Sequence, residues 1–389
     1  MSKSFSIVAG GAIAVLVLLG VGDAVVAYRA GTQFQTRLES LNGQSLGNPA
    51  LRLANVQVDR GWFQSRATAQ LRFTTPGAGV ISMPLTFQTT QGLTLRGSAM
   101  LVDMEMGLPD NPAVAALLGA VHDPKPVSAR VAVNLAGQPT HIEVSIAPMN
   151  SSSTTKTAIP VNVAWGGGNE VMDVDGYFSP QGGSMRGTVS LLPWSVRVAQ
   201  AAFSLYMGPV TGTFQESGRP GNLHGSFAMT IGKSGFAMAG GGRDVVIEHL
   251  SMQADAAARQ PGDATPGNPS GLQGGESGFR NLNFIANLSK PSAGTIAMTG
   301  NAKFIVTPEA LQAQSSGKLQ EFQASLLKNA QVQLQVRVTR ALLAKLPAPQ
   351  LDQMESAGYL RVDGLDEVVD VAVKDGAISL NGHPVASRP

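Results

Sequence analysis

The chain has no cysteine among its 389 residues, and this absence removes several kinds of chemistry at once. It excludes disulfides, thiolate metal ligands, cysteine nucleophiles and lipid attachment through cysteine. Charged residues are also scarce, at 14% against roughly 25% in average globular domains. The net charge is only +2 and no basic cluster is interleaved with aromatic residues, so we expect no nucleic-acid partner.

No group of residues stands out as a catalytic, cofactor-binding or metal site. The five histidines form no HExxH or HxH pattern, and two S-x-x-K matches lack their partner motifs. A glycine-rich stretch at 239–244 precedes a strand-like segment, whereas a phosphate loop needs a helix there. We therefore expect a protein without enzymatic activity and without a cofactor. A hydrolase would need a nucleophile and a base within hydrogen-bonding reach in a pocket.

The longest apolar run extends from Phe5 to Tyr28 and contains one charge, Asp23. A helix of this length rises about 36 Å, enough to cross a hydrocarbon core of about 30 Å. The run is longer than the apolar region of a cleaved signal peptide, so we favour a retained membrane anchor over residues 1–30. Its apolar residues include Ile7, Ala14, Leu16, Leu18, Leu19 and Val25. Since no second span follows, we expect a bacterial inner-membrane protein with the bulk of the chain in the periplasm.

After the anchor, apolar residues recur with a period of two. In the stretch 63–74, FQSRATAQLRFT, apolar or small residues alternate with polar ones, and QVQLQVRVT at 331–339 repeats the pattern. Antiparallel sheets with one solvated face produce this alternation. Helical spacing is confined to 31–43, 111–121, a segment at 307–330 that breaks near Gly317, and two short pieces after it. The predicted fold class is mainly β with some helix (α+β): a transmembrane helix, long antiparallel amphipathic sheets and a mixed C-terminal part.

The predicted domain organisation has four parts. The anchor at 1–30 precedes a β-rich periplasmic region at 31–256 and a helix/strand region at 279–389. Between the last two, residues 257–278 are dominated by glycine, proline, serine and aspartate, which is typical of a flexible loop or linker. A long insertion inside one sheet is the alternative for this segment.

Three pieces of the chain carry a family resemblance: GTQFQTRLESL after the anchor, DRGWFQSRATAQLRF, and the tail GYLRVDGLDEVVDVAVKDGAISLNG. Together they resemble the YdgA-like family of bacterial inner-membrane proteins, described mainly as a domain of unknown function. The resemblance implies an inner-membrane anchor, a β-rich periplasmic body and no established catalysis. The motif positions, which we interpret as structural turns and strand entries, are Arg60, Gly61, Phe63, Ser65, Gly376, Leu380, Asn381 and Gly382.

The functional question is how the apolar side of the sheet is hidden from water. A sheet that curls into an open trough offers a groove for an acyl chain, whereas a sheet covered by its own elements has a filled core. Small inward residues such as Ala67 and Ala69 fit either case. We expect a membrane-anchored protein of envelope maintenance that binds lipid or another apolar ligand. The alternative is a structural scaffold that binds another envelope protein, and the oligomeric state stays open.

Overall fold

The computed structural model describes most of the chain after residue 26. The described residues are 27–44, 51–61, 64–75, 79–91, 98, 100–110, 125–134, 136–154, 160–177, 179, 181–198, 203–219, 221–238, 244–259, 275–315, 318–344 and 348–385. The expected membrane anchor and the expected helix at 111–121 lie outside them, apart from the last residues of the anchor. Within these ranges no helix is both long enough and apolar enough to cross a membrane.

The chain forms two compact units. Unit 1 comprises Met1–Ser179 with Gly183–Gln200, and unit 2 comprises Pro180–Gly182 with Ala201–Pro389. This division differs from the residue ranges expected from the sequence, which placed at 257–278 a loop or linker or, as the alternative, an insertion inside one sheet. The reason is that strands from both sides of that segment pair with each other inside unit 2.

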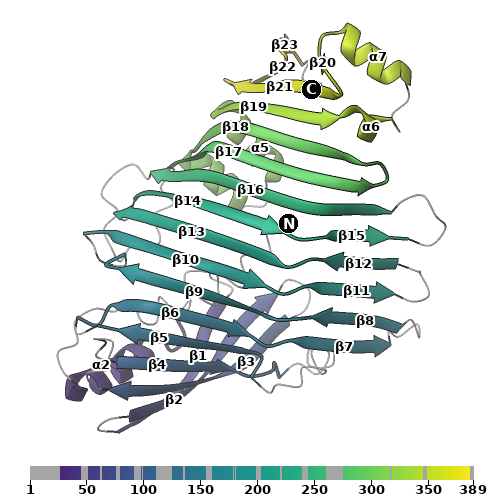
Figure 1. The fold of residues 1–389 in the computed structure, drawn as a ribbon. Helices are drawn as coiled ribbons and strands as arrows, with labels where there is room; N and C mark the ends of the chain where they lie inside the picture. The colour runs from purple at the N-terminus through teal and green to yellow at the C-terminus, as the bar shows by residue number, and fades with distance from the viewer. Residues whose placement is uncertain are drawn as a thin grey trace. The chain divides into compact units, whose positions relative to one another are not determined.

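Unit 1 contains one helix and eleven strands among its described residues (Figure 1). They are α2 (Ala27–Ser40), β1 (Leu51–Arg60), β2 (Gln64–Thr75), β3 (Gly79–Gln91), β4 (Met100–Met106), β5 (Val127–Val133), β6 (Pro139–Ile146), β7 (Met149–Thr154), β8 (Pro160–Trp165), β9 (Gly168–Asp175), β10 (Gly183–Leu191) and β11 (Trp194–Val198). Strands β1 to β6 pair in sequence, β9 and β10 continue from β6, and β7, β8 and β11 form a second run. Every one of these pairings is antiparallel, as the alternation predicts.

Proline and glycine divide long strands of unit 1 at matching positions. The chain passes from β6 to β7 at Pro148, from β8 to β9 at Gly167, and from β10 to β11 at Pro193. Gly167 has φ +86, and a Cβ there would lie 2.3 Å from the carbonyl oxygen of Ile146. Only glycine fits a position that combines positive φ with such a close approach of backbone.

The inner face of the unit 1 sheet is a closed apolar core. Residues from five neighbouring strands are each at most 7% exposed: Leu85, Phe87, Val102, Met104, Val131, Ile142, Val144 and Met172. Helix α2 contributes Phe34 and Leu38, and the Phe34 ring stands edge-on to Phe87 with 6.4 Å between ring centroids. Ala67 and Ala69 are also buried, at 3% and 4%. Their small size therefore serves close packing in this unit.

Unit 2 is likewise built of antiparallel strands, with short helices near its C-terminal strands (Figure 1). Its elements are β12 (Phe203–Met207), β13 (Val210–Arg219), β14 (Asn222–Ile231), β15 (Ser234–Ala237), β16 (Val245–Arg259), β17 (Gly275–Lys290), β18 (Gly294–Val306), α4 (Pro308–Ser315), α5 (Leu319–Lys328), β19 (Ala330–Thr339), α6 (Arg340–Leu343), α7 (Ala348–Ser356), β20 (Arg361–Asp363), β21 (Asp366–Lys374), β22 (Ala377–Leu380) and β23 (His383–Pro384). The main order is β13, β14, β16, β17, β18, β19 and β21. Strand β15 follows β14 along the same edge of β16, and β12 pairs with β15.

Several sequence predictions are confirmed in detail, and one needs correction. The first hairpin, the helix at 31–43 and the interrupted helix at 307–330 appear as β1–β2, α2 and the pair α4–α5. The segment 257–278, expected to be a loop or linker throughout, is strand at both ends, because β16 continues to Arg259 and β17 begins at Gly275. Its alanines and glycines carry little strand signal of their own, and pairing with neighbouring strands overrides this weak propensity.

We predict that the two units respond differently to loss of the same side chain. Ile142 is fully buried in unit 1. Its truncation in Ile142→Ala should therefore lower the free energy of unfolding by about 2–5 kcal/mol. Ile296 of β18 is only half-buried, so Ile296→Ala should cost clearly less. Urea unfolding followed by circular dichroism measures both; equal losses would contradict the difference in packing between the units.

Candidate functional site

An apolar face runs without interruption across the seven main strands of unit 2. The register aligns Met252, Phe284 and Met298, and the same row extends to Met229 on one side and Val336 on the other. Parallel rows lie on either side of it. We call this surface the open face; it comprises Val210, Gly212, Phe214, Phe227, Met229, Ile231, Leu250, Met252, Ala254, Leu282, Phe284, Ala286, Ile296, Met298, Gly300, Leu334, Val336, Val338, Val369 and Val371.

The open face is incompletely covered, in contrast to the inner face of unit 1. Its aromatic and methionine side chains are all half-buried, and full burial is limited to Val210, Ala254, Leu282 and Ala286. At the end nearest α4 and α5 the cover is better, since Ala302, Ala330 and Val373 on the same side of the sheet are at most 9% exposed. The centre of the face is therefore the part that remains available to a ligand.

The dimensions of the open face suit a chain-like apolar ligand. Seven strands at a spacing of about 4.8 Å span about 29 Å, whereas an acyl chain in one leaflet of a bilayer spans about 15 Å. A ligand that covered about 200 Å² of this surface would gain about 5 kcal/mol before the costs of association. Three of the central side chains are methionines, whose flexibility lets a surface adapt to ligands of different shape.

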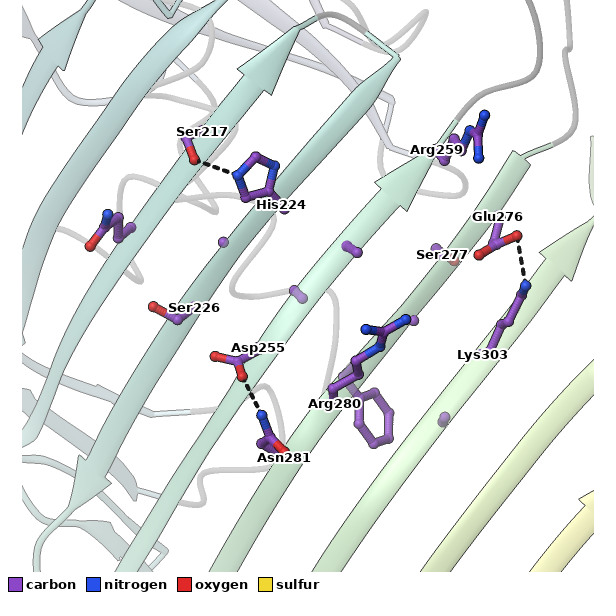
Figure 2. Close-up of a pocket in the computed structure, with 17 residues that line it drawn as sticks. Ser217, His224, Ser226, Asp255, Arg259, Glu276, Ser277, Arg280, Asn281 and Lys303 are labelled. Carbon is purple, nitrogen blue, oxygen red and sulfur yellow. Dashed lines mark hydrogen bonds and ion pairs between the residues drawn. The ribbon is translucent and has the colours of Figure 1, made fainter.

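The opposite, polar face of the same sheet carries a hollow of about 580 Å³ (Figure 2). Small residues form its floor, among them Ala257 and Gly278, and a Cβ at Gly278 would lie 2.3 Å from the carbonyl oxygen of Ala302. Longer polar side chains from β14, β16, β17 and β18 surround this floor. A second hollow of about 480 Å³ adjoins it over β17, β18, β19 and β21, and the two share Arg280 and Lys303.

A serine and a histidine meet in the first hollow, the arrangement that a hydrolase would require. Ser217 Oγ and His224 Nε2 are 3.0 Å apart, and the two residues face each other across β13 and β14. Among the described residues, however, no carboxylate binds the other ring nitrogen of His224. Both residues also lie inside paired strands, where the ladder occupies backbone N–H groups that an oxyanion hole would need. We therefore interpret the contact as a cross-strand polar pair.

Within the described part of the chain, no group of histidines, aspartates and glutamates is arranged to hold a metal ion. Asp173 and Asp175, which with Gly176 form the sequence DVDG, lie at the end of β9, and Gly176 turns the chain with φ +61.

A buried carboxylate, Glu367 of β21, was missed by sequence reasoning. Its side chain is 1% exposed, and its closest cation is Arg340, with Nε 3.3 Å from Oε1. Neither carboxylate oxygen has a hydrogen bond among the described residues. Burial and the nearby Glu355 raise the pKa of Glu367, and Arg340 opposes them. The alternation of β21 contained the signal, because Glu367 shares the parity of Val369 and Val371 and so falls on the apolar side.

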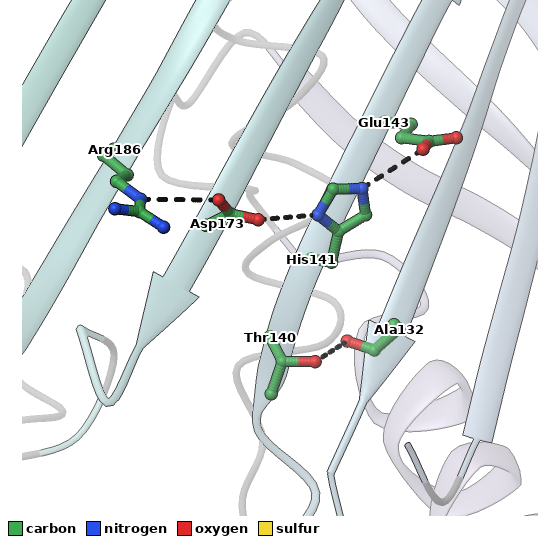
Figure 3. A network of polar contacts seen from close by, with 6 residues as sticks. All are labelled: Ala132, Thr140, His141, Glu143, Asp173 and Arg186. Carbon is green, nitrogen blue, oxygen red and sulfur yellow. Dashed lines mark hydrogen bonds and ion pairs between the residues drawn. The ribbon is translucent and has the colours of Figure 1, made fainter. Parts of the chain in front are cut away.

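A chain of polar contacts crosses the outer face of unit 1 (Figure 3). His141 binds Asp173 through Nδ1 at 2.8 Å and Glu143 through Nε2 at 3.1 Å, and Arg186 reaches Asp173 at 3.4 Å. Partial burial works to lower the pKa of His141, but the two carboxylates outweigh it and the pKa is raised. The hydrogen bond from His141 lowers the pKa of Asp173 in turn. Protonated His141 thus joins β6 to β9.

We predict that this network makes unit 1 less stable as the pH rises above neutrality. A histidine with a raised pKa stabilises the fold fully below its ordinary pKa of about 6.5, and this contribution is lost as the pH passes the folded pKa. His141→Gln and Asp173→Asn should both flatten the dependence of unfolding free energy on pH as the pH rises above the ordinary histidine pKa. Urea unfolding at several pH values tests this; unchanged slopes in both variants would contradict the role of His141.

The first group of motif residues lies at the hairpin between β1 and β2. Arg60 is the last residue of β1 and stands opposite Ser65. A Cβ at Gly61 would lie 2.2 Å from the carbonyl oxygen of Gln64, so this turn requires glycine. Ser65 is buried beside Thr89 and Gln91, and Gln91 Nε2 donates to Ser65 Oγ at 3.2 Å. Phe63 lies outside the described residues.

The second group lies in the C-terminal strands, where Asn381 is the central residue. Its Oδ1 accepts from the backbone N–H of Asp370 at 2.8 Å, and its Nδ2 donates to the carbonyl oxygens of Tyr359 and Val368. Asn381 itself has φ +48, a conformation that asparagine tolerates better than most residues. Gly376 and Gly382 occupy neighbouring turns with φ +79 and +81, and Leu380 is half-buried at the end of β22.

We predict that Asn381→Ala lowers the unfolding free energy by about 1–3 kcal/mol, because three backbone groups lose their partner. Asp375→Ala is the matched control, since Asp375 also has positive φ, at +52, but lies in an exposed turn. This control should lose only the cost of placing alanine at positive φ, and so less than Asn381→Ala. A neutral Asn381→Ala variant in thermal unfolding would show that the contacts of Asn381 do not hold this region together.

Comparison with known proteins places the chain in a bacterial family. The sequence model of a family described as bacterial protein of unknown function (DUF945) matches residues 1–262, about two thirds of the chain. The matched part contains the motif around Gly61, whereas the motif around Asn381 lies beyond it. No curated protein and no solved structure matches the chain.

Proposed function

The chain belongs to this bacterial family of unknown function, and we propose that it is a non-enzymatic, inner-membrane-anchored periplasmic protein that holds lipid acyl chains on the open face. The apolar run from Phe5 to Tyr28 supports the anchor, and the YdgA-like resemblance of the motifs supports the same placement. The Ser217–His224 pair lacks the features that would favour hydrolysis.

The observation that carries the proposal is the contrast between two faces built by the same alternation. At the centre of the inner face of unit 1, large apolar side chains such as Phe87, Val131 and Ile142 are buried. On the open face, by contrast, Phe227, Met252 and Met298 remain half-buried. Contiguous apolar surface of this kind marks binding sites on soluble domains. An extended acyl chain can lie along a row of such side chains without needing any hydrogen bond from the sheet.

The alternative is a scaffold whose open face is covered by another envelope protein. An amphipathic segment of a partner could fill the same apolar surface. The half-burial of the face is common to both proposals, so the chemical identity of the bound species decides between them.

The test is mass spectrometry of the full-length chain extracted in an uncharged detergent. We expect bound lipid in the wild type and a loss of several-fold or more in Met298→Glu, because a carboxylate on this face would have to be desolvated by the acyl chain. Thr299→Glu is the matched control: the neighbouring residue of β18 is exposed on the polar face, so lipid should be retained. The intact mass also reports whether residues 1–30 are present.

Two results would count against the lipid proposal. Wild-type chain free of lipid, with a protein cross-linked to β18, would favour the scaffold. Equal lipid content in Met298→Glu and Thr299→Glu would show that lipid binds elsewhere, or only through the detergent micelle.

A further inference from the structure

Three cations gather on the polar face of unit 2 at the second hollow. Arg280, Lys303 and Lys374 come from β17, β18 and β21, and no carboxylate lines this hollow. Lys303, Gln331 and Lys374 are direct cross-strand partners, so Gln331 lies between the two lysines. The backbones of the two lysine strands are about 9.6 Å apart, which lets both ammonium groups reach a ligand above Gln331.

A β-bulge in β17 leaves Arg280 without an acidic partner. Arg280 stands opposite Asp255, yet Asp255 Oδ2 accepts from Asn281 Nδ2 at 2.6 Å instead. Asn281 can do this because the register shifts at this point and Asn281 has φ +53. Among the described residues, Arg280 forms no ion pair. Figure 2 shows Arg280 beside the Asp255–Asn281 contact rather than within it.

The other carboxylate near these cations, that of Glu276, is likewise already in an ion pair. Glu276 Oε2 binds Lys303 Nζ at 2.8 Å. Within the described residues Lys374 has no acidic partner, so Arg280 and Lys374 are two uncompensated cations on either side of a paired one. An anion placed between them would be attracted by both charges.

Amide groups between the cations add directed donors. The backbone N–H of Asn281 donates to Asn301 Oδ1 at 3.0 Å, and Asn301 lines the hollow. Gln331 and Gln333 also line it. Residues with donor groups from four strands line this one hollow. A tetrahedral anion with three or four acceptor oxygens can accept from more of these groups than a carboxylate with two.

We propose that the hollow bounded by Arg280, Lys303, Gln331 and Lys374 binds a phosphate group. The guanidinium fork of Arg280 would take two phosphate oxygens, and the lysines would supply charge from the opposite side. The site lies on the face of the sheet opposite the open face and does not depend on lipid binding there. A free phosphate compound and the phosphate of a lipid headgroup present the same chemistry.

The test is calorimetric titration of the full-length chain in an uncharged detergent at low ionic strength. Inorganic phosphate is the first probe, and mixed micelles that carry a phosphatidic acid are the second. We expect saturable binding that is weakened about tenfold or more in the double variant Arg280→Gln/Lys374→Gln, because charge-assisted hydrogen bonds are lost. Lys233→Gln is the matched control: it removes an exposed lysine of unit 2 that pairs with Glu248 outside both hollows, and binding should not change.

The two probes separate the sources of the phosphate. Tight binding of both identifies a free phosphate group as sufficient, and tight binding of the micelles alone identifies a lipid headgroup. The proposal is overturned if neither probe binds saturably, or if the double variant binds both as tightly as the wild type does.

Discussion

The period of two in its strands is the constraint on which the rest of this structure depends. Antiparallel pairing fixes the register, so that residues such as Met252, Phe284 and Met298 fall into one row on one side of the sheet. Each apolar face formed in this way must be covered, at a gain of about 25 cal/mol per Å² removed from water. Unit 1 covers its face from within, with α2 and its own packed strands. Unit 2 covers one end of its apolar face and leaves the centre half-buried, and this difference in burial is the observation behind the proposed function.

The local pattern predicted the strands, the first hairpin and the broken helix, because each depends on neighbours in sequence. It could not predict which apolar face is closed. Ala67 and Ala69 fit a groove or a packed core equally well until the burial in unit 1 shows close packing. Strand pairing also decided the ends of the 257–278 segment, where alanine and glycine have little preference of their own. Tertiary contacts, rather than propensity, therefore set both the covered face and the extent of β16 and β17.

The polar candidates were hidden from the sequence for a different physical reason. Ser217 and His224 are seven residues apart and meet only through the register of one hairpin. Arg280 is free of Asp255 only because a bulge and a positive φ at Asn281 redirect that carboxylate. Neither event follows from residue type, since bulges depend on the strands that flank them. Glu367 is the exception, because its parity in β21 already placed it among the valines.

The cations on the polar face of unit 2 are notable because charged residues are scarce in this chain. In a chain with 14% charged residues and a net charge of +2, most of the surface must be covered by uncharged polar groups. Ion pairs account for many of the charges that remain, as with Lys303 and Glu276 or Arg186 and Asp173. The lining of the hollow formed by Arg280, Lys303 and Lys374 contains no acid, and among the described residues Lys303 alone of the three has an acidic partner, Glu276. Successive side chains of a strand point to opposite faces of the sheet. Residues that are adjacent in sequence can therefore contribute one to this basic surface and the other to the apolar open face.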